Sequence, residues 1–101
     1  MDNQHRMVKG YRELTVEEIA LINEIKAAGE TLAELVGKVR GHVLNQGEAA
    51  MADSLERRAA GDIELARLEA ADAVGWVYAA RRDFQRGLMA LTRAVTKPEG
   101  F

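Results

Sequence analysis

The first twelve residues carry side chains that could bind a planar, anionic ligand. They bring together cations, hydrogen-bond donors and one aromatic ring, on Asn3, Gln4, His5, Arg6, Lys9, Tyr11 and Arg12. Gly10 permits a close approach of the backbone, and the ring of Tyr11 offers a flat face on which a nucleobase can stack. Charged termini are commonly solvated arms that bind nothing. The residue types alone therefore make this segment only a candidate ligand site.

Two cations farther along the chain are also candidates. Lys26 follows the apolar position Ile25 in a predicted helix, where its ammonium could stack over a base or pair with a phosphate. A lysine whose stem simply covers apolar surface is the more common case. Arg93 stands among Leu91, Ala94 and Val95, near an apolar stripe, and a guanidinium in that position needs an anionic partner.

The sequence lacks the residue patterns that catalysis or metal binding requires. It has no cysteine and two histidines, and these do not have the spacing of metal ligands. It contains no glycine-rich phosphate loop, no Ser-His-Asp set and no carboxylate pair isolated from counter-charges. We therefore predict a binding protein that is not an enzyme and that uses no metal or cofactor.

Charge is distributed unevenly along the 101 residues, which are enough for one domain. The net charge is −2, which argues against binding to DNA or RNA polymers. Residues 1–12 and 81–101 are basic, whereas residues 13–80 hold six Lys and Arg against thirteen Asp and Glu. If the ends meet, they make a local positive site. No apolar run is long enough to span a membrane, so a soluble, cytoplasmic protein is expected.

The first helix is predicted over residues 16–45, after an arm of residues 1–14. Thr15 and Glu18 have the capping-box spacing. Apolar positions then recur in steps of 3 and 4, which is a heptad seam, at Ile22, Ile25, Gly29, Leu32, Val36, Val39 and Val43. We expect the helix to fray at Asn45–Gly47, followed by a connection over residues 46–61.

A second helix is predicted over residues 62–97, with Asp62 as its N-cap and Pro98 as its stop. Its expected seam is Ile63, Ala66, Ala70, Ala73, Val77, Ala80, Phe84, Gly87, Leu91 and Ala94. The fold class is thus all-α, a long antiparallel helical hairpin. Apolar residues outside both seams predict a homo-oligomer; the alternative is a monomeric three-helix bundle that uses residues 48–60.

Both ends of the chain carry recognisable motifs. The opening contains NQHR, KGYREL and T-x-E-E-I. The second half contains W-V-x-x-A-R-x-D-x-Q-x-G-L-M-A-L-T-R-A-V-x-x-P, from Trp76 to Pro98. With these motifs, about residues 3–44 and 72–98 resemble a family of small phage proteins, the hairpin-domain sponges of the anti-CBASS and anti-Thoeris type, and are closer to the anti-CBASS members.

The resemblance implies a hexamer that sequesters cyclic nucleotide messengers of host immunity, in the host cytoplasm and without cleaving them. It implies that Tyr11 and Lys26, fifteen residues apart, sandwich the bases of a cGAMP-like cyclic dinucleotide. It further implies a separate site for cyclic trinucleotides, to which we assign Arg6 and Lys9. Two positions depart from the family pattern: Gly75 replaces a common arginine and Ala28 a small polar residue, and Arg12 or Arg93 could compensate.

Three other functions are consistent with the sequence. A cyclic ADP-ribose isomer could be the ligand, as in the Thoeris antagonists. A helical structural or adaptor protein would use its seams for protein partners only and would bind no small molecule. A phosphodiesterase that degrades the messenger is the weakest alternative, because no acid–base or metal set is visible.

Overall fold

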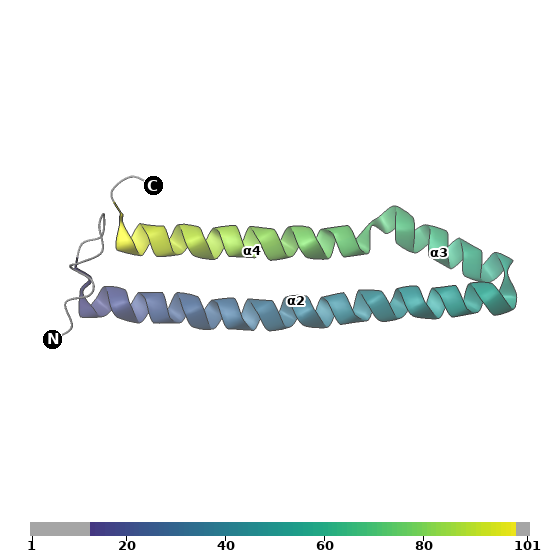
Figure 1. Cartoon of the computed structure of the whole chain (residues 1–101), viewed down its shortest axis with the longest axis horizontal. Coiled ribbons are helices and arrows are strands. Elements are labelled where there is room, and N and C mark those ends of the chain that lie inside the picture. Colours follow the sequence, from purple (N-terminus) through teal and green to yellow (C-terminus); the bar gives the residue numbers. More distant parts are fainter. Residues whose placement is uncertain (1–12, 99–101) are drawn as a thin grey trace. The chain divides into compact units, whose positions relative to one another are not determined.

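Every regular element in the described part of the chain is an α-helix. The computed structural model describes residues 13–98, which form α2 (Val16–Arg57), α3 (Ala59–Ala71) and α4 (Ala73–Thr96), with no strand among them (Figure 1). The all-α prediction is confirmed. The chain divides into two compact units: the first is Met1–Leu32 with Asp83–Phe101, and the second is Ala33–Arg82. The single domain predicted for residues 1–101 stays a prediction.

The start of α2 is fixed by the predicted capping box. The backbone N–H of Thr15 donates to the Glu18 carboxylate over 2.9 Å, and the N–H of Glu18 donates to the Thr15 hydroxyl over 3.1 Å. These bonds satisfy two donors that a helix N-terminus would otherwise leave without partners. The helix begins at Val16, as predicted.

Replacing Thr15 with alanine should destabilise the chain by about 1 kcal/mol, because the cap of α2 loses its side-chain acceptor. The measurement is urea unfolding followed by helical circular dichroism. Thr31→Ala is the matched control: the Thr31 hydroxyl donates only to the Ala27 carbonyl, 3.2 Å away within the same helix, and we expect no loss. Equal stability of the two variants would show that the capping box does not hold the end of the helix.

The first unit pairs the start of α2 with the end of α4, and the two segments run in opposite directions (Figure 1). The predicted α2 seam is confirmed here, because Ile22, Ile25, Gly29 and Leu32 are all half-buried. A Cβ built on Gly29 would lie 3.2 Å from Cδ1 of Leu88, so the small residue lets α4 come close.

The predicted seam of α4 is confirmed for Ala73, Val77, Ala80 and Phe84 and is wrong beyond them. Gly87, Leu91 and Ala94 are exposed, whereas the side chains turned inward belong to Leu88, Thr92 and Val95. Burying Leu88 and Val95 removes more apolar area from water than burying Gly87 and Ala94. The helix therefore presents its bulkier face to α2.

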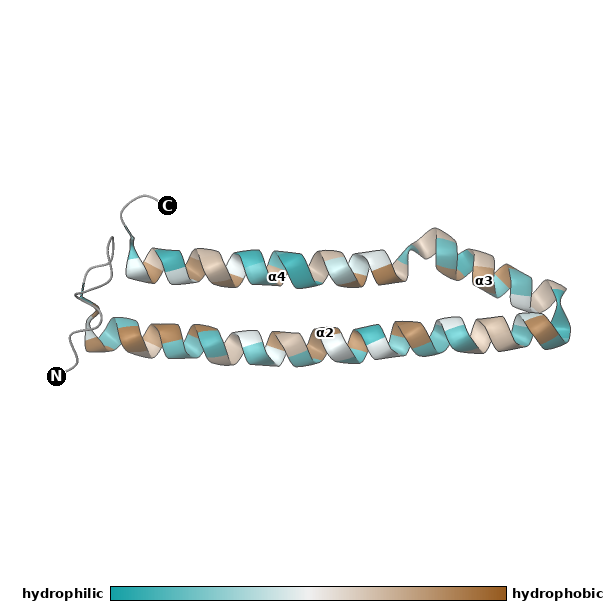
Figure 2. Cartoon of the chain, viewed as in Figure 1, coloured by the Kyte–Doolittle hydropathy of each residue, from teal (hydrophilic) through white to brown (hydrophobic). Residues whose placement is uncertain are grey.

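In the second unit α2 continues well past its predicted end. We expected the helix to end near Asn45 and a connection over residues 46–61, but α2 runs unbroken to Arg57. Its seam proceeds through small residues: Gly47 and Ser54 are half-buried and Ala50 is only 4% exposed. Small residues look like a weak apolar face in a sequence, yet they allow close helix packing. Figure 2 shows hydrophobic residues recurring along all of α2.

The turn between α2 and α3 is tighter than the predicted connection. Arg58 alone separates the helices and has a positive φ of 49°. Asp62, predicted as an N-cap, instead lies within the first turn of α3 and accepts a hydrogen bond from the Ser54 hydroxyl. Gly61 is buried directly against the backbone of Ser54. A side chain at position 61 would collide there.

The predicted second helix is divided in two at Asp72. This residue adopts the left-handed conformation, with φ of 50° and ψ of 43°, which aspartate tolerates better than most residues. Its N–H donates to the Glu69 carbonyl over 3.1 Å, and its own carbonyl accepts from the N–H of Trp76 over 3.0 Å. The break changes the helical phase: Ile63, Ala66 and Ala70 are exposed, contrary to prediction, and Leu65 and Leu68 are half-buried instead. Helix α4 ends at Thr96, just before the predicted stop at Pro98.

Two exposed ion pairs lie on the surface of the second unit. Arg57 pairs with Asp53 at 2.6 Å and Arg67 with Glu64 at 2.5 Å. The hydrogen bond from each arginine lowers the pKa of its carboxylate partner. An ion pair that lowers the pKa of a carboxylate stabilises the fold at pH values above the ordinary pKa of that acid. This stabilisation is lost as the pH falls through the lowered pKa. Solvent screens both pairs, so they contribute little to the free energy of unfolding.

Candidate ligand-binding site

The structure places two of the six predicted site residues, and both lie in the first unit. Lys26 is exposed in the first half of α2, and Arg93 is exposed in the last turn of α4. Tyr11, Arg12, Arg6 and Lys9 lie outside the described residues. Arg93 suits the negative end of the α4 dipole, and its carbonyl accepts a 2.8 Å hydrogen bond from the N–H of Lys97.

An apolar groove also lies in the first unit, but it does not contain either cation. It has a volume of about 390 Å³ and is lined by Leu21, Glu24, Ile25, Ala28, Leu88, Leu91, Ala94 and Val95. At 100° per residue, Glu24 and Ala28 fall on one side of the Ile25 seam position and Lys26 on the other. Lys26 and the groove therefore belong to different sides of the unit.

The structure gives a local account of Gly75 but not of Ala28, the two departures from the family pattern. Ala28 lines the apolar groove of the first unit and is exposed, so a polar side chain there would keep its water. Gly75 lies in the first turn of α4, and a Cβ built on it would stand 2.6 Å from Cγ of Asp72. A carboxylate thus occupies the space beside position 75, so an arginine there would require Asp72 to rotate away.

Neither a metal centre nor a membrane span is found in the described residues. Within residues 13–98, no three histidine, aspartate or glutamate side chains are grouped so that they could hold a metal ion. None of the three described helices is both long and apolar enough to cross a bilayer.

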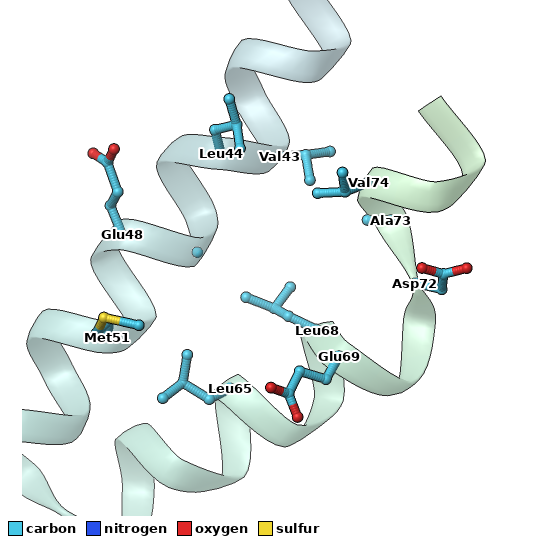
Figure 3. A pocket seen from close by; sticks show the side chains of 11 residues that line it. Val43, Leu44, Glu48, Met51, Leu65, Leu68, Glu69, Asp72, Ala73 and Val74 are labelled. Carbon is cyan, nitrogen blue, oxygen red and sulfur yellow. The ribbon is translucent and has the colours of Figure 1, made fainter. Parts of the chain in front are cut away.

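The sequence analysis missed a second groove, which lies in the second unit between α2, α3 and the start of α4. Its volume is about 530 Å³ and its lining residues are Val43, Leu44, Gly47, Glu48, Met51, Leu65, Leu68, Glu69, Asp72, Ala73 and Val74. Figure 3 shows Leu65 and Leu68 pointing from α3 towards α2, with the carboxylates of Glu48 and Asp72 directed outwards. Leu44, Met51 and Leu68 are apolar residues outside both predicted seams, and this surplus is the signal that could have revealed the groove.

Comparison with known proteins identifies the family. The model of the Acb2/Tad1 hairpin domain matches residues 3–96. Anti-CBASS protein 2 of Pseudomonas phage JBD67 is 39% identical over 107 aligned positions, which cover 99% of this chain and 99% of that protein. The match includes the segment of residues 46–61 that the sequence motifs left out. The chain belongs to the Acb2/Tad1 hairpin-domain family.

Proposed function

We propose that this chain is a phage protein that blocks host CBASS immunity by sequestering cyclic oligonucleotide messengers in the cytoplasm of the infected cell. The observation that carries the proposal is the 39% identity, across nearly the whole of both chains, to a phage protein named for its anti-CBASS action. In this proposal the messenger is bound without being cleaved.

The ligand site that we propose combines the basic arm with α2. Tyr11 and Lys26 sandwich the bases of a cyclic dinucleotide, with the ring stacked on one face of a base and the ammonium over its other face. Arg12 or Arg93 neutralises the phosphates, whereas Arg6 and Lys9 serve a separate site for cyclic trinucleotides. The capped start of α2 supports this assignment, because the helix fixes the backbone position from which the Lys26 side chain extends.

We further propose that neighbouring copies complete the site in a homohexamer. Support comes from the apolar surface that the chain leaves exposed: Leu55 is 77% exposed, Trp76 70% and Met89 62%. Among the described apolar side chains only Ala50 and Val77 are buried. Within the described residues, a single copy therefore leaves many large apolar side chains partly in water, and association would remove them from it.

The test is ligand retention. The purified chain is incubated with a cGAMP-like cyclic dinucleotide, a cyclic trinucleotide or a cyclic ADP-ribose isomer, freed of unbound ligand and then denatured. We expect an intact cyclic dinucleotide to be released on denaturation. Before denaturation it should bind with nanomolar affinity, a binding free energy of about −12 kcal/mol. Release of a linear product would indicate a phosphodiesterase, and retention of the ADP-ribose isomer alone would indicate a Thoeris antagonist. If the chain retains none of these ligands, the proposal is wrong and the structural or adaptor function is favoured.

A further inference from the structure

The groove of the second unit, here called the acidic groove, combines an apolar floor with a negative rim. Its lining residues include Glu48, Glu69 and Asp72 and no lysine or arginine, and the carboxylates of Glu48 and Asp72 point outwards from the floor (Figure 3). Within the described part of the chain, none of these carboxylates has an ion-pair partner. Met51 is 60% exposed and Leu44 41%. Such a surface fits a side chain with an apolar stem and a cationic head.

One face of α4 has the complementary chemistry. Tyr78, Arg82, Arg86 and Met89 follow each other in steps of 4, 4 and 3 and form what we call the arginine stripe. All four side chains are exposed, and the two arginines have no ion-pair partner among residues 13–98. Arginine carries methylenes that cover apolar surface and a guanidinium that pairs with carboxylates. Tyrosine and arginine are also enriched in protein interfaces.

The two surfaces match in spacing as well as in charge. Along α2 the groove presents Leu44, Glu48 and Met51 in steps of 4 and 3, and along α4 the stripe presents Arg82, Arg86 and Met89 in the same steps. Each set spans about 10 Å of helix. With these steps aligned, Glu48 faces Arg86 and Met51 faces Met89. Leu44 then faces Arg82, whose methylenes can cover it.

We propose that the acidic groove of one copy receives the arginine stripe of a second copy. Arg82 and Arg86 lay their methylenes on the groove and pair with its carboxylates, and Met89 packs on the apolar floor. The contact is heterologous, because two different surfaces meet. It does not involve Tyr11 or Lys26, so its success or failure is separate from that of the ligand site.

Disulfide trapping tests the contact directly, because the chain has no cysteine of its own. A Met51→Cys copy and a nitrogen-15-labelled Met89→Cys copy are mixed without ligand, oxidised mildly and weighed by mass spectrometry. We expect the mixed disulfide to be the main product. The matched control replaces Met51→Cys with Leu35→Cys, a 51% exposed position of α2 outside the groove, and should give little crosslink. Disulfides only between like copies, or equal yields with the control, would overturn the proposal.

A charge swap provides an independent readout that does not depend on oxidation. Glu48→Arg with Glu69→Arg should weaken self-association ~100-fold, because like charges then face each other. Mixing that chain with an Arg82→Glu, Arg86→Glu chain should restore association. The control, Glu30→Arg with Glu34→Arg, changes the net charge equally outside the groove and should associate normally. Tight association of the groove variant, with its helical circular dichroism intact, would contradict the proposal.

Discussion

Replacing Lys26 with alanine is expected to weaken the binding of a cyclic dinucleotide strongly while leaving the helices, and the proposed oligomer, intact. The side chain is exposed on α2 and is not among the residues that line the apolar groove of the first unit, so its removal creates no cavity. A desolvated cation over an aromatic ring contributes about 2 kcal/mol or more, which corresponds to a loss of at least ~30-fold in affinity. Titration calorimetry measures this loss as a rise in the dissociation constant.

Two further variants make this prediction sharper. Tyr11→Ala should give a comparable loss, since stacking on one base contributes about 1–3 kcal/mol. Lys38→Ala removes an exposed lysine from the same helix and should bind like the unmodified chain. If the Lys26 and Tyr11 variants retain the dinucleotide as firmly as the Lys38 control does, the assigned site is wrong, although the family membership stands.

Local signals determined how well the helices could be predicted. The capping box at Thr15 and Glu18 uses residues three apart, and the structure confirms it atom by atom. The half-buried positions of the first α2 seam follow equally from a short periodic pattern. Pro98 marked the end of α4 to within two residues. Each of these features is decided by neighbours in the sequence, so no knowledge of the partner helix is needed.

The errors arise where a distant segment decides the outcome. Ala50 and Ser54 form a weak apolar face on their own, and only the close packing of the second unit explains why α2 continues to Arg57. The left-handed conformation of Asp72 rotates the buried face of α3 relative to that of α4. Counting apolar positions in steps of 3 and 4 cannot reveal this rotation. The proposed site has the same difficulty, because Tyr11 and Lys26 were paired through a family resemblance. The proposed pocket is shared between copies, and spacing within one chain cannot identify such a pocket.

Gly61→Ala is the second substitution with a large expected effect. Position 61 lies inside α3, where alanine ordinarily favours the helix by about 1 kcal/mol over glycine. Here a Cβ would overlap the backbone N and Cα of Ser54 and stand 2.5 Å from the carbonyl carbon of Asp53. A backbone cannot rotate away as a side chain can. We therefore expect a net loss of about 1–3 kcal/mol in the free energy of unfolding, as for other overpacked sites.

Gly37→Ala is the matched control for this clash, because Gly37 is also helical but a Cβ there would meet nothing within 4 Å. It should stabilise the chain by up to about 1 kcal/mol, so the two substitutions are predicted to have opposite signs. Urea unfolding of both variants measures the difference. If Gly61→Ala were stabilising as well, α2 and α3 could not approach each other as closely at Ser54 as the structure shows, and the tight turn at Arg58 would have to be wider.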